Sequence, residues 1–177
     1  MLKKILFWGV LAGVLAGLPM SFLALGTTSH AAHSMTVGYL TMLIALSTIF
    51  FAIKRHRDIA QGGVIRFWPA LVMGLGISVI AGVLYAAIWD LAVMITHTDF
   101  AGDYAKSVIA GAQAKGSSAA DVAKLTAEMD QFKAQYASPL YRWSMTFIEI
   151  FPVGVLVSLV SAILLCNSRF LPARARS

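Results

Sequence analysis

Two acidic residues lie in the most apolar parts of this sequence and are its first candidates for chemistry. Asp90 is the only charged residue in 68–95, and Glu149 is the only one in 143–166. An acid at membrane depth is costly and marks a candidate functional site by default. Two carboxylates that lie close together share a proton or bind a cation. If they meet at similar depth in antiparallel neighbours, the pair predicts a small proton- or cation-coupled transporter.

The same acids also have a structural interpretation. Glu149 lies about six residues into its apolar run, roughly 9 Å deep at about 1.5 Å per residue, where a carboxylate can stay hydrated or bond a neighbouring hydroxyl. At the helical repeat it points nearly opposite Ser158, away from the small residues of the run. Pro152 removes the helical hydrogen bond to the Ile148 carbonyl and predicts a kink that would reorient Glu149. A functional acid and a structural anchor therefore both remain open.

Histidines suggest a third possibility, a metal-dependent membrane enzyme. His30 and His33 form an H-x-x-H pair, and His97 lies close to Asp99. Imidazole and carboxylate groups together can hold a transition metal, but this spacing is weak support for a site. No nucleotide-binding loop, nucleophile elbow or zincin motif occurs in the sequence. We therefore expect no catalytic residue, no metal and no cofactor, and predict that the protein is not an enzyme.

The composition indicates that lipid is part of the solvent around this chain. Of its 177 residues, 59% are hydrophobic and only 12% are charged, whereas soluble domains carry roughly a quarter charged residues. A membrane-spanning helix needs about 20 apolar residues. Four runs meet this length, so the sequence predicts an all-α integral membrane protein forming a single membrane domain over 1–177, with spans at about 5–25, 35–53, 68–95 and 143–166.

The basic residues predict how the spans are oriented. Nine of the fourteen lysines and arginines precede the first span, join the second to the third or follow the fourth, against one acid, Asp58. The other five lie in 96–142 together with five acids, which cancel them. By the positive-inside rule, both termini are expected in the cytoplasm. The net charge of +6 is therefore a topology signal and not an indication of nucleic-acid binding.

The basic loop between the second and third spans is also a candidate surface for anionic lipid headgroups. Topology alone is the other interpretation of this loop. The expected headgroup ligands are Lys54, Arg55, Arg57 and Arg66.

Segment 96–140 is the sizeable part of the sequence outside the predicted spans. Apolar residues recur at helical spacing from Val122 to Tyr136, and Ser118 followed by Asp121 resembles a capping box. A weaker helical pattern precedes them. We therefore predict an external helical hairpin between the third and fourth spans.

Small residues recur along one face of each span and predict where the spans pack, because lipid provides no hydrophobic drive between helices. The first run carries three glycines and is longer than the core of a signal peptide, so we expect it to remain as a span. A four-helix bundle would use these faces; a homo-oligomer or a membrane protein partner is the alternative. The residues concerned are Gly9, Gly13, Gly17, Gly74, Ser78 and Gly82.

Three stretches resemble a known family of bacterial membrane proteins. They are "GYLTMLIALSTIFFAIKRHRD", "GGVIRFWPALVMGLGISVIAGVLYAAIWD" and "MTFIEIFPVGVLVSLVSAILL". They look like the family catalogued as domain of unknown function 4199, and the resemblance covers nearly the whole chain. It implies four spans, a helical insert before the last span and a location in the bacterial inner membrane, but no activity. We therefore expect a non-enzymatic membrane component or accessory subunit, with coupled transport and metal-dependent catalysis as alternatives.

Overall fold

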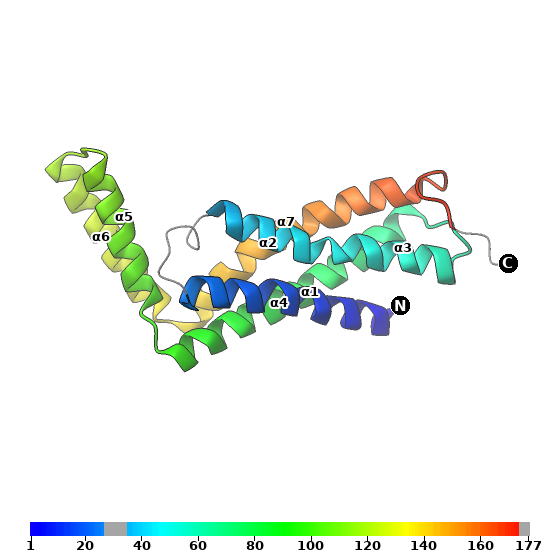
Figure 1. Cartoon of the computed structure of the whole chain (residues 1–177), viewed down its shortest axis with the longest axis horizontal. Coiled ribbons are helices and arrows are strands. Elements are labelled where there is room, and N and C mark those ends of the chain that lie inside the picture. Colours follow the sequence, from blue (N-terminus) through cyan, green and yellow to red (C-terminus); the bar gives the residue numbers. More distant parts are fainter. Residues whose placement is uncertain (27–34, 174–177) are drawn as a thin grey trace.

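The computed structural model describes residues 1–26 and 35–173. Within these residues the regular elements are seven α-helices, and no strand occurs (Figure 1). They are α1 (Leu2–Gly26), α2 (Met35–Leu46), α3 (Thr48–Ala60), α4 (Phe67–Thr96), α5 (Phe100–Ala114), α6 (Ala119–Tyr136) and α7 (Pro139–Cys166).

Four helical segments are long and apolar enough to cross a membrane. They are Leu2–Phe22, Thr36–Ala60, Phe67–Thr96 and Pro139–Cys166. Each overlaps one of the four predicted spans. Large apolar side chains cover their outer surfaces, as expected where lipid replaces water. The chain is therefore a membrane protein.

The second span consists of two helices, α2 and α3, that meet at Ser47. The Ser47 hydroxyl donates a hydrogen bond to the Ile44 carbonyl at 2.6 Å, and the Thr48 hydroxyl donates one to the Ala45 carbonyl at 2.7 Å. Such side-chain bonds compete with the backbone bonds of a helix. Ser47 is a turn residue with helical dihedral angles, and its amide still donates to the Leu43 carbonyl at 2.9 Å.

Helix α1 packs closely on α4 through glycines. A Cβ atom added to Gly9 would lie 2.6 Å from the Cβ of Ile80, and one added to Gly13 would lie 3.0 Å from the Ala81 carbonyl oxygen. Gly17 faces Ile88 in the same way. These distances are shorter than atomic contact, so the two backbones approach this closely only because no side chain intervenes.

Helix α4 meets α7 through glycine and serine. A Cβ atom added to Gly74 would lie 2.7 Å from the Ser158 hydroxyl, and one added to Gly82 would lie 2.8 Å from the Phe147 ring. The hydroxyls of Ser78 and Ser158 are both buried and lie 3.1 Å apart. Six small residues predicted to mediate packing thus lie at the contacts of α4 with α1 and with α7.

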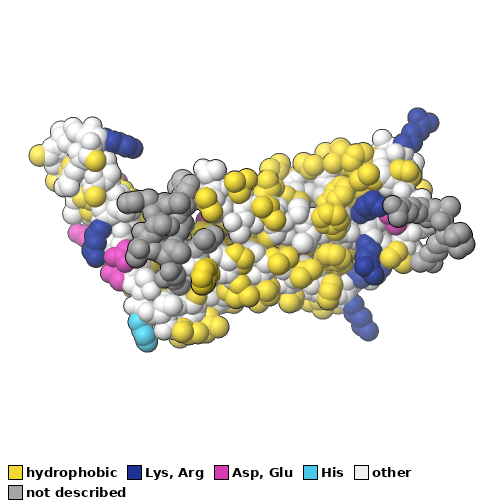
Figure 2. Space-filling view, in the orientation of Figure 1, with side chains coloured by type: hydrophobic (Ala, Val, Ile, Leu, Met, Phe, Trp, Pro, Cys, Tyr) yellow, Lys and Arg dark blue, Asp and Glu magenta, His cyan; other side chains and the backbone are white. Residues whose placement is uncertain are grey.

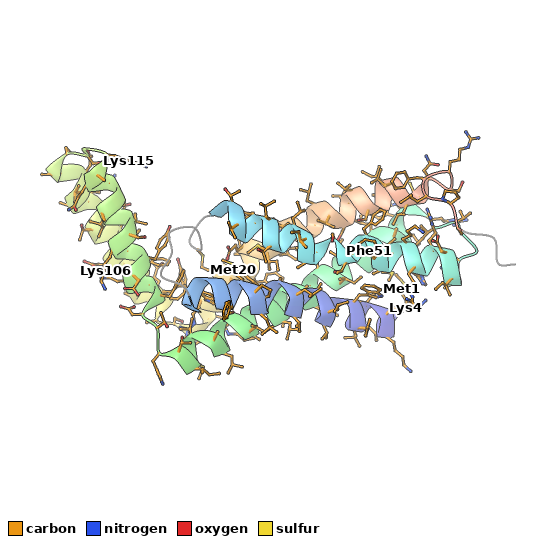
Figure 3. The ribbon with its side chains drawn as sticks, in the orientation of Figure 1. Met1, Lys4, Met20, Phe51, Lys106 and Lys115 are labelled. Carbon is orange, nitrogen blue, oxygen red and sulfur yellow. The ribbon has the colours of Figure 1, made fainter. Side chains whose placement is uncertain are left out.

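Helices α5 and α6 form an antiparallel hairpin that projects beyond one end of the long helices (Figure 1). Gly116 adopts a positive φ of 77° in the turn, and the Ser118 side chain accepts a hydrogen bond from the Asp121 amide at 3.2 Å to cap α6. Lys115 at the hairpin tip and Met1 lie at opposite ends of the molecule (Figure 3). We refer to these as the hairpin end and the N-terminal end.

Candidate functional site

Asp90 forms an ion pair with Arg142 at the hairpin end of the long helices. The Nε and Nη2 atoms of Arg142 each lie 2.5 Å from the Oδ1 atom of Asp90, and the two side chains are only 13% and 17% exposed. Arg142 also donates from Nη1 to the Tyr136 carbonyl at 3.2 Å. The arginine therefore compensates the Asp90 charge and links α4 to the start of α7 and the end of α6.

Aromatic side chains surround this ion pair. The indole of Trp89 donates to the Tyr136 hydroxyl at 2.8 Å, and its ring packs edge-on against Phe100 with centroids 4.9 Å apart. The Arg142 guanidinium lies 5.8 Å from the centre of the Tyr136 ring, within the range of a cation–π contact. We call Trp89, Asp90, Phe100, Tyr136 and Arg142 the junction cluster, because it joins the hairpin to α4 and α7.

Tyr136 shows how buried the junction cluster is. Burial raises the pKa of its phenol, while the bond from Trp89 and the nearby Arg142 cation act in the opposite direction. The carboxylates of Glu149 and Asp90 add to the increase in the Tyr136 pKa. Tyr136 is therefore a neutral phenol at physiological pH, available as a hydrogen-bond acceptor for Trp89.

Glu149 lies near the junction cluster without forming part of its hydrogen-bond network. Glu149 is exposed on α7 and forms no hydrogen bond or ion pair with another residue in 1–26 or 35–173. The partner of Asp90 is thus Arg142, not Glu149. Helix α7 continues through Pro152, which lies inside it, so the Ile148 carbonyl lacks its usual helical donor.

A second group of polar contacts forms at the N-terminal end. The Arg57 side chain is fully buried and donates from Nε to Asp58 at 2.8 Å, from Nη1 to the Phe170 carbonyl at 2.9 Å and from Nη2 to the Leu171 carbonyl. The sequence analysis predicted that Arg57 binds lipid headgroups. This prediction was wrong, because a guanidinium with no exposed surface cannot reach lipid. It fastens the segment after α7 onto α3.

The other residues of the basic loop are more accessible. Lys54 is partly exposed and pairs with Asp58 at 2.5 Å, while Arg55 and Arg66 are exposed. Lys4 of α1 contacts the Nδ1 atom of His56 at 3.2 Å. Figure 2 shows a group of basic side chains around the end of the molecule opposite the hairpin.

Residues 7–167 match the profile of a family described as protein of unknown function (DUF4199). The chain belongs to this family. The match confirms the resemblance and overlaps all four long apolar segments. No significant match was found among curated proteins or among solved structures.

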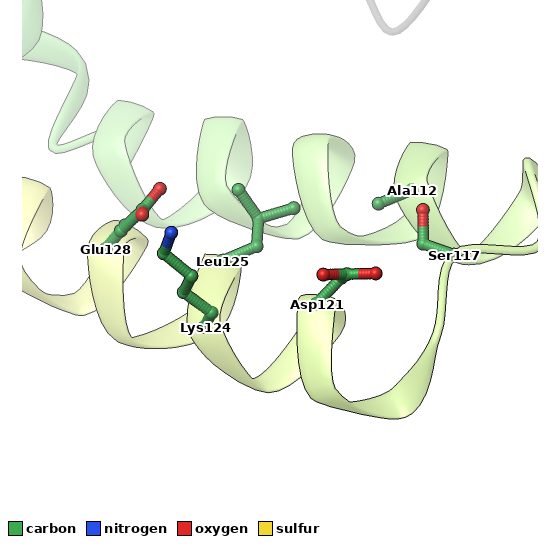
Figure 4. A pocket seen from close by; sticks show the side chains of 6 residues that line it. All are labelled: Ala112, Ser117, Asp121, Lys124, Leu125 and Glu128. Atoms are coloured by element: carbon green, nitrogen blue, oxygen red, sulfur yellow. The ribbon is translucent and has the colours of Figure 1, made fainter.

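The surface pockets of this DUF4199 protein are shallow. One of about 280 Å³ lies between the hairpin helices and is lined in part by Asp121 and Lys124 (Figure 4). The Asp121 carboxylate already accepts a hydrogen bond from the Ser118 hydroxyl at 2.7 Å. Another, of about 300 Å³, lies between Val83 of α4 and Phe147 of α7. Within residues 1–26 and 35–173 there is no group of three His, Cys, Asp or Glu residues able to hold a metal. His30 and His33 lie outside the described residues.

Sequence reasoning missed the partner of Asp90 in the DUF4199 chain. Arg142 is one of the five basic residues in 96–142 whose charge the acids there cancel, and its position beside the start of the last span matches the depth of Asp90. Opposite charges at matching depth in neighbouring spans can therefore predict an ion pair. Trp89 and Tyr136 gave no such signal, because an aromatic residue at a helix end is also typical of a membrane interface.

Proposed function

We propose that this DUF4199 protein is a non-enzymatic component of the bacterial inner membrane, an accessory subunit that presents its α5–α6 hairpin outside the cytoplasm. In this arrangement the four spans form a bundle and both termini are cytoplasmic. The hairpin is the surface that a partner protein would contact.

The junction cluster is the observation that carries this proposal. A hairpin attached through loops alone would move independently of the spans. Here Arg142 bonds both Asp90 of α4 and the end of α6, while Trp89 bonds Tyr136. Fixing the hairpin at a defined direction reduces the entropy lost when a partner binds it. This arrangement supports a docking role.

The distribution of charge supports the orientation. The exposed cations Lys3, Arg55, Arg66 and Arg169 belong to loops or helix ends at the N-terminal end, and lysines and arginines remain on the cytoplasmic side during insertion. On the hairpin, four lysines are matched by four acids, and Lys106 and Lys133 form ion pairs with Asp103 and Asp130. The hairpin therefore lacks the excess of positive charge that would retain it in the cytoplasm.

Photo-cross-linking in bacterial membranes tests the accessory role. A photoreactive amino acid at exposed Lys124 should give one discrete product of higher mass, while the same group at Phe22 on the lipid-facing side of α1 should not. Arg142→Asp should weaken the product several-fold, and Arg142→Asp combined with Asp90→Arg should restore it. Only monomer with the Lys124 probe, in membranes where the protein is intact, would overturn the proposal.

A further inference from the structure

We propose that the hairpin-side third of α7 binds a transmembrane helix of a partner protein that places a lysine or arginine side chain against Glu149. The inference rests on the proposed role as an accessory subunit and names the chemistry of the partner. It concerns the face of α7 that carries Met145, Ile148, Glu149, Pro152 and Leu156.

This face of α7 points away from the other helices. Met145, Ile148 and Leu156 are 43%, 63% and 60% exposed, and Glu149 and Pro152 are exposed with them. The buried residues of α7, among them Ile150 and Ser158, lie on the opposite side of the helix. Large apolar side chains around a single carboxylate form a surface that another helix can pack against.

Glu149 lies within the apolar length of its span. It is 17 residues from Cys166, which ends α7, and this corresponds to about 25 Å at about 1.5 Å per residue. The hydrocarbon core of a bilayer is about 30 Å thick. Arg142, two helical turns farther toward the hairpin, marks the interface. Glu149 therefore lies within the apolar length of α7 and not at its end, and a charge that faces lipid there without a partner is costly.

The face offers hydrogen-bond acceptors without a matching donor. Glu149 contributes a carboxylate, and the Ile148 carbonyl lacks the donor that Pro152 cannot provide. The nearest cation of the junction cluster, Arg142, already binds Asp90 and the Tyr136 carbonyl. A surface with acceptors only is complementary to a group that has donors only, and lysine and arginine are such groups.

A basic side chain on a partner helix fits this surface better than lipid does. Acyl chains carry no donors. A helix that crosses the same membrane can hold a cation at the depth of Glu149, while its apolar residues cover Ile148 and Leu156. Acids and bases within membranes usually pair with each other in this way.

Synthetic transmembrane helices provide a test that needs no identified partner. The full chain, carrying a donor dye on its single cysteine, Cys166, would be placed in phosphatidylcholine vesicles with acceptor-labelled oligoleucine helices. One helix has a single lysine in the third that faces the hairpin end, and its control has leucine there. We expect energy transfer to show about tenfold tighter association with the lysine helix.

Variants of Glu149 test whether its carboxylate causes the preference for the lysine helix over the leucine helix. Glu149→Leu should abolish it and Glu149→Gln, which keeps the size of the side chain, should reduce it. Ile163→Gln, which changes an exposed side chain of α7 outside this third of the helix, should leave the preference unchanged. Equal association of both helices with the parent protein, or a preference that survives Glu149→Leu, would overturn the inference. Self-association that depends on Glu149 without a preference for lysine would overturn it too, since a second copy would then cover the face.

The outcome is separable from that of the hairpin experiment. A lysine preference without hairpin cross-links would leave the α7 interface standing and remove the docking role of the hairpin. Hairpin cross-links without a lysine preference would leave the docking role of the hairpin standing and remove the α7 interface.

Discussion

Arg57 and Arg142 use their guanidinium groups in the same way at opposite ends of the molecule. Each binds one carboxylate and at least one backbone carbonyl, Asp58 with Phe170 and Leu171 in one case and Asp90 with Tyr136 in the other. The planar fork of arginine can satisfy several acceptors at once. Each arginine thus connects segments that are distant in the sequence.

Removing Arg57 should destabilise the fold strongly. Arg57→Met would leave the Phe170 carbonyl without its donor and Asp58 with Lys54 as its only cation, and leaving a buried acceptor unpaired costs about 1–3 kcal/mol. The free energy of unfolding in detergent micelles would measure it. Arg55→Met is the matched control, because Arg55 is exposed on the same helix and should change stability by less than about 0.5 kcal/mol. Equal effects of the two variants would contradict the role of Arg57.

The ion pair of Asp90 also bears on coupled transport, the alternative function suggested by the two acids. Because Arg142 neutralises Asp90, the expected carboxylate pair with Glu149 does not form. We therefore expect the proton or cation flux of vesicles that contain the protein to equal that of protein-free vesicles. Glu149→Gln should leave this flux unchanged. A flux in the parent protein that Glu149→Gln abolishes, at equal reconstitution, would establish transport instead.

Helices α1, α4 and α7 pack through small residues, whereas the hairpin helices pack through large ones. Gly74 and Ser158 let α4 and α7 approach closely, while Tyr104 and Phe132 fill the space between α5 and α6 with ring centroids 5.7 Å apart. Membrane helices lack a hydrophobic drive for association and depend on close contact, while helices in water bury apolar area. The two regions therefore respond differently to an added methyl group.

Gly74→Ala and Gly111→Ala should have opposite effects on stability. A Cβ atom at Gly74 would lie 2.8 Å from the Ser158 Cβ, and such overpacking costs about 1–3 kcal/mol. A Cβ atom at Gly111 of α5 would meet nothing within 4 Å, so alanine there should stabilise by about 0.5–1 kcal/mol through helix propensity. Thermal unfolding followed by circular dichroism measures both. A neutral Gly74→Ala would show that α4 and α7 are not closely packed.

The elements could be predicted from the sequence to different degrees. Four apolar runs predicted four spans, because membrane crossing depends on length and hydropathy alone. The break at Ser47 was missed, since serine and threonine also occur in uninterrupted membrane helices and their bonds to Ile44 and Ala45 are local choices. The Asp90–Arg142 pair required knowing which helices are neighbours, and hydropathy does not carry that information.

At the scale of the whole molecule, the two ends differ in charge and in construction. The N-terminal end gathers basic side chains, several of them exposed, whereas charges on the hairpin are balanced (Figure 2). The hairpin is tied to the spans through the junction cluster, so its position follows the orientation of α4 and α7. The orientation of the spans therefore determines on which side of the membrane the hairpin and every docking surface on it lie.

Cysteine labelling decides this orientation. In a Cys166→Ser background, Ser117→Cys places a thiol at the exposed hairpin turn without removing the Ser118 cap, and Arg55→Cys places one on the exposed side of α3 at the N-terminal end. A membrane-impermeant maleimide applied to spheroplasts should label position 117 and reach position 55 only after lysis, because a four-span chain with cytoplasmic termini puts these sites on opposite sides. The reverse pattern would place the hairpin in the cytoplasm and overturn the proposed orientation.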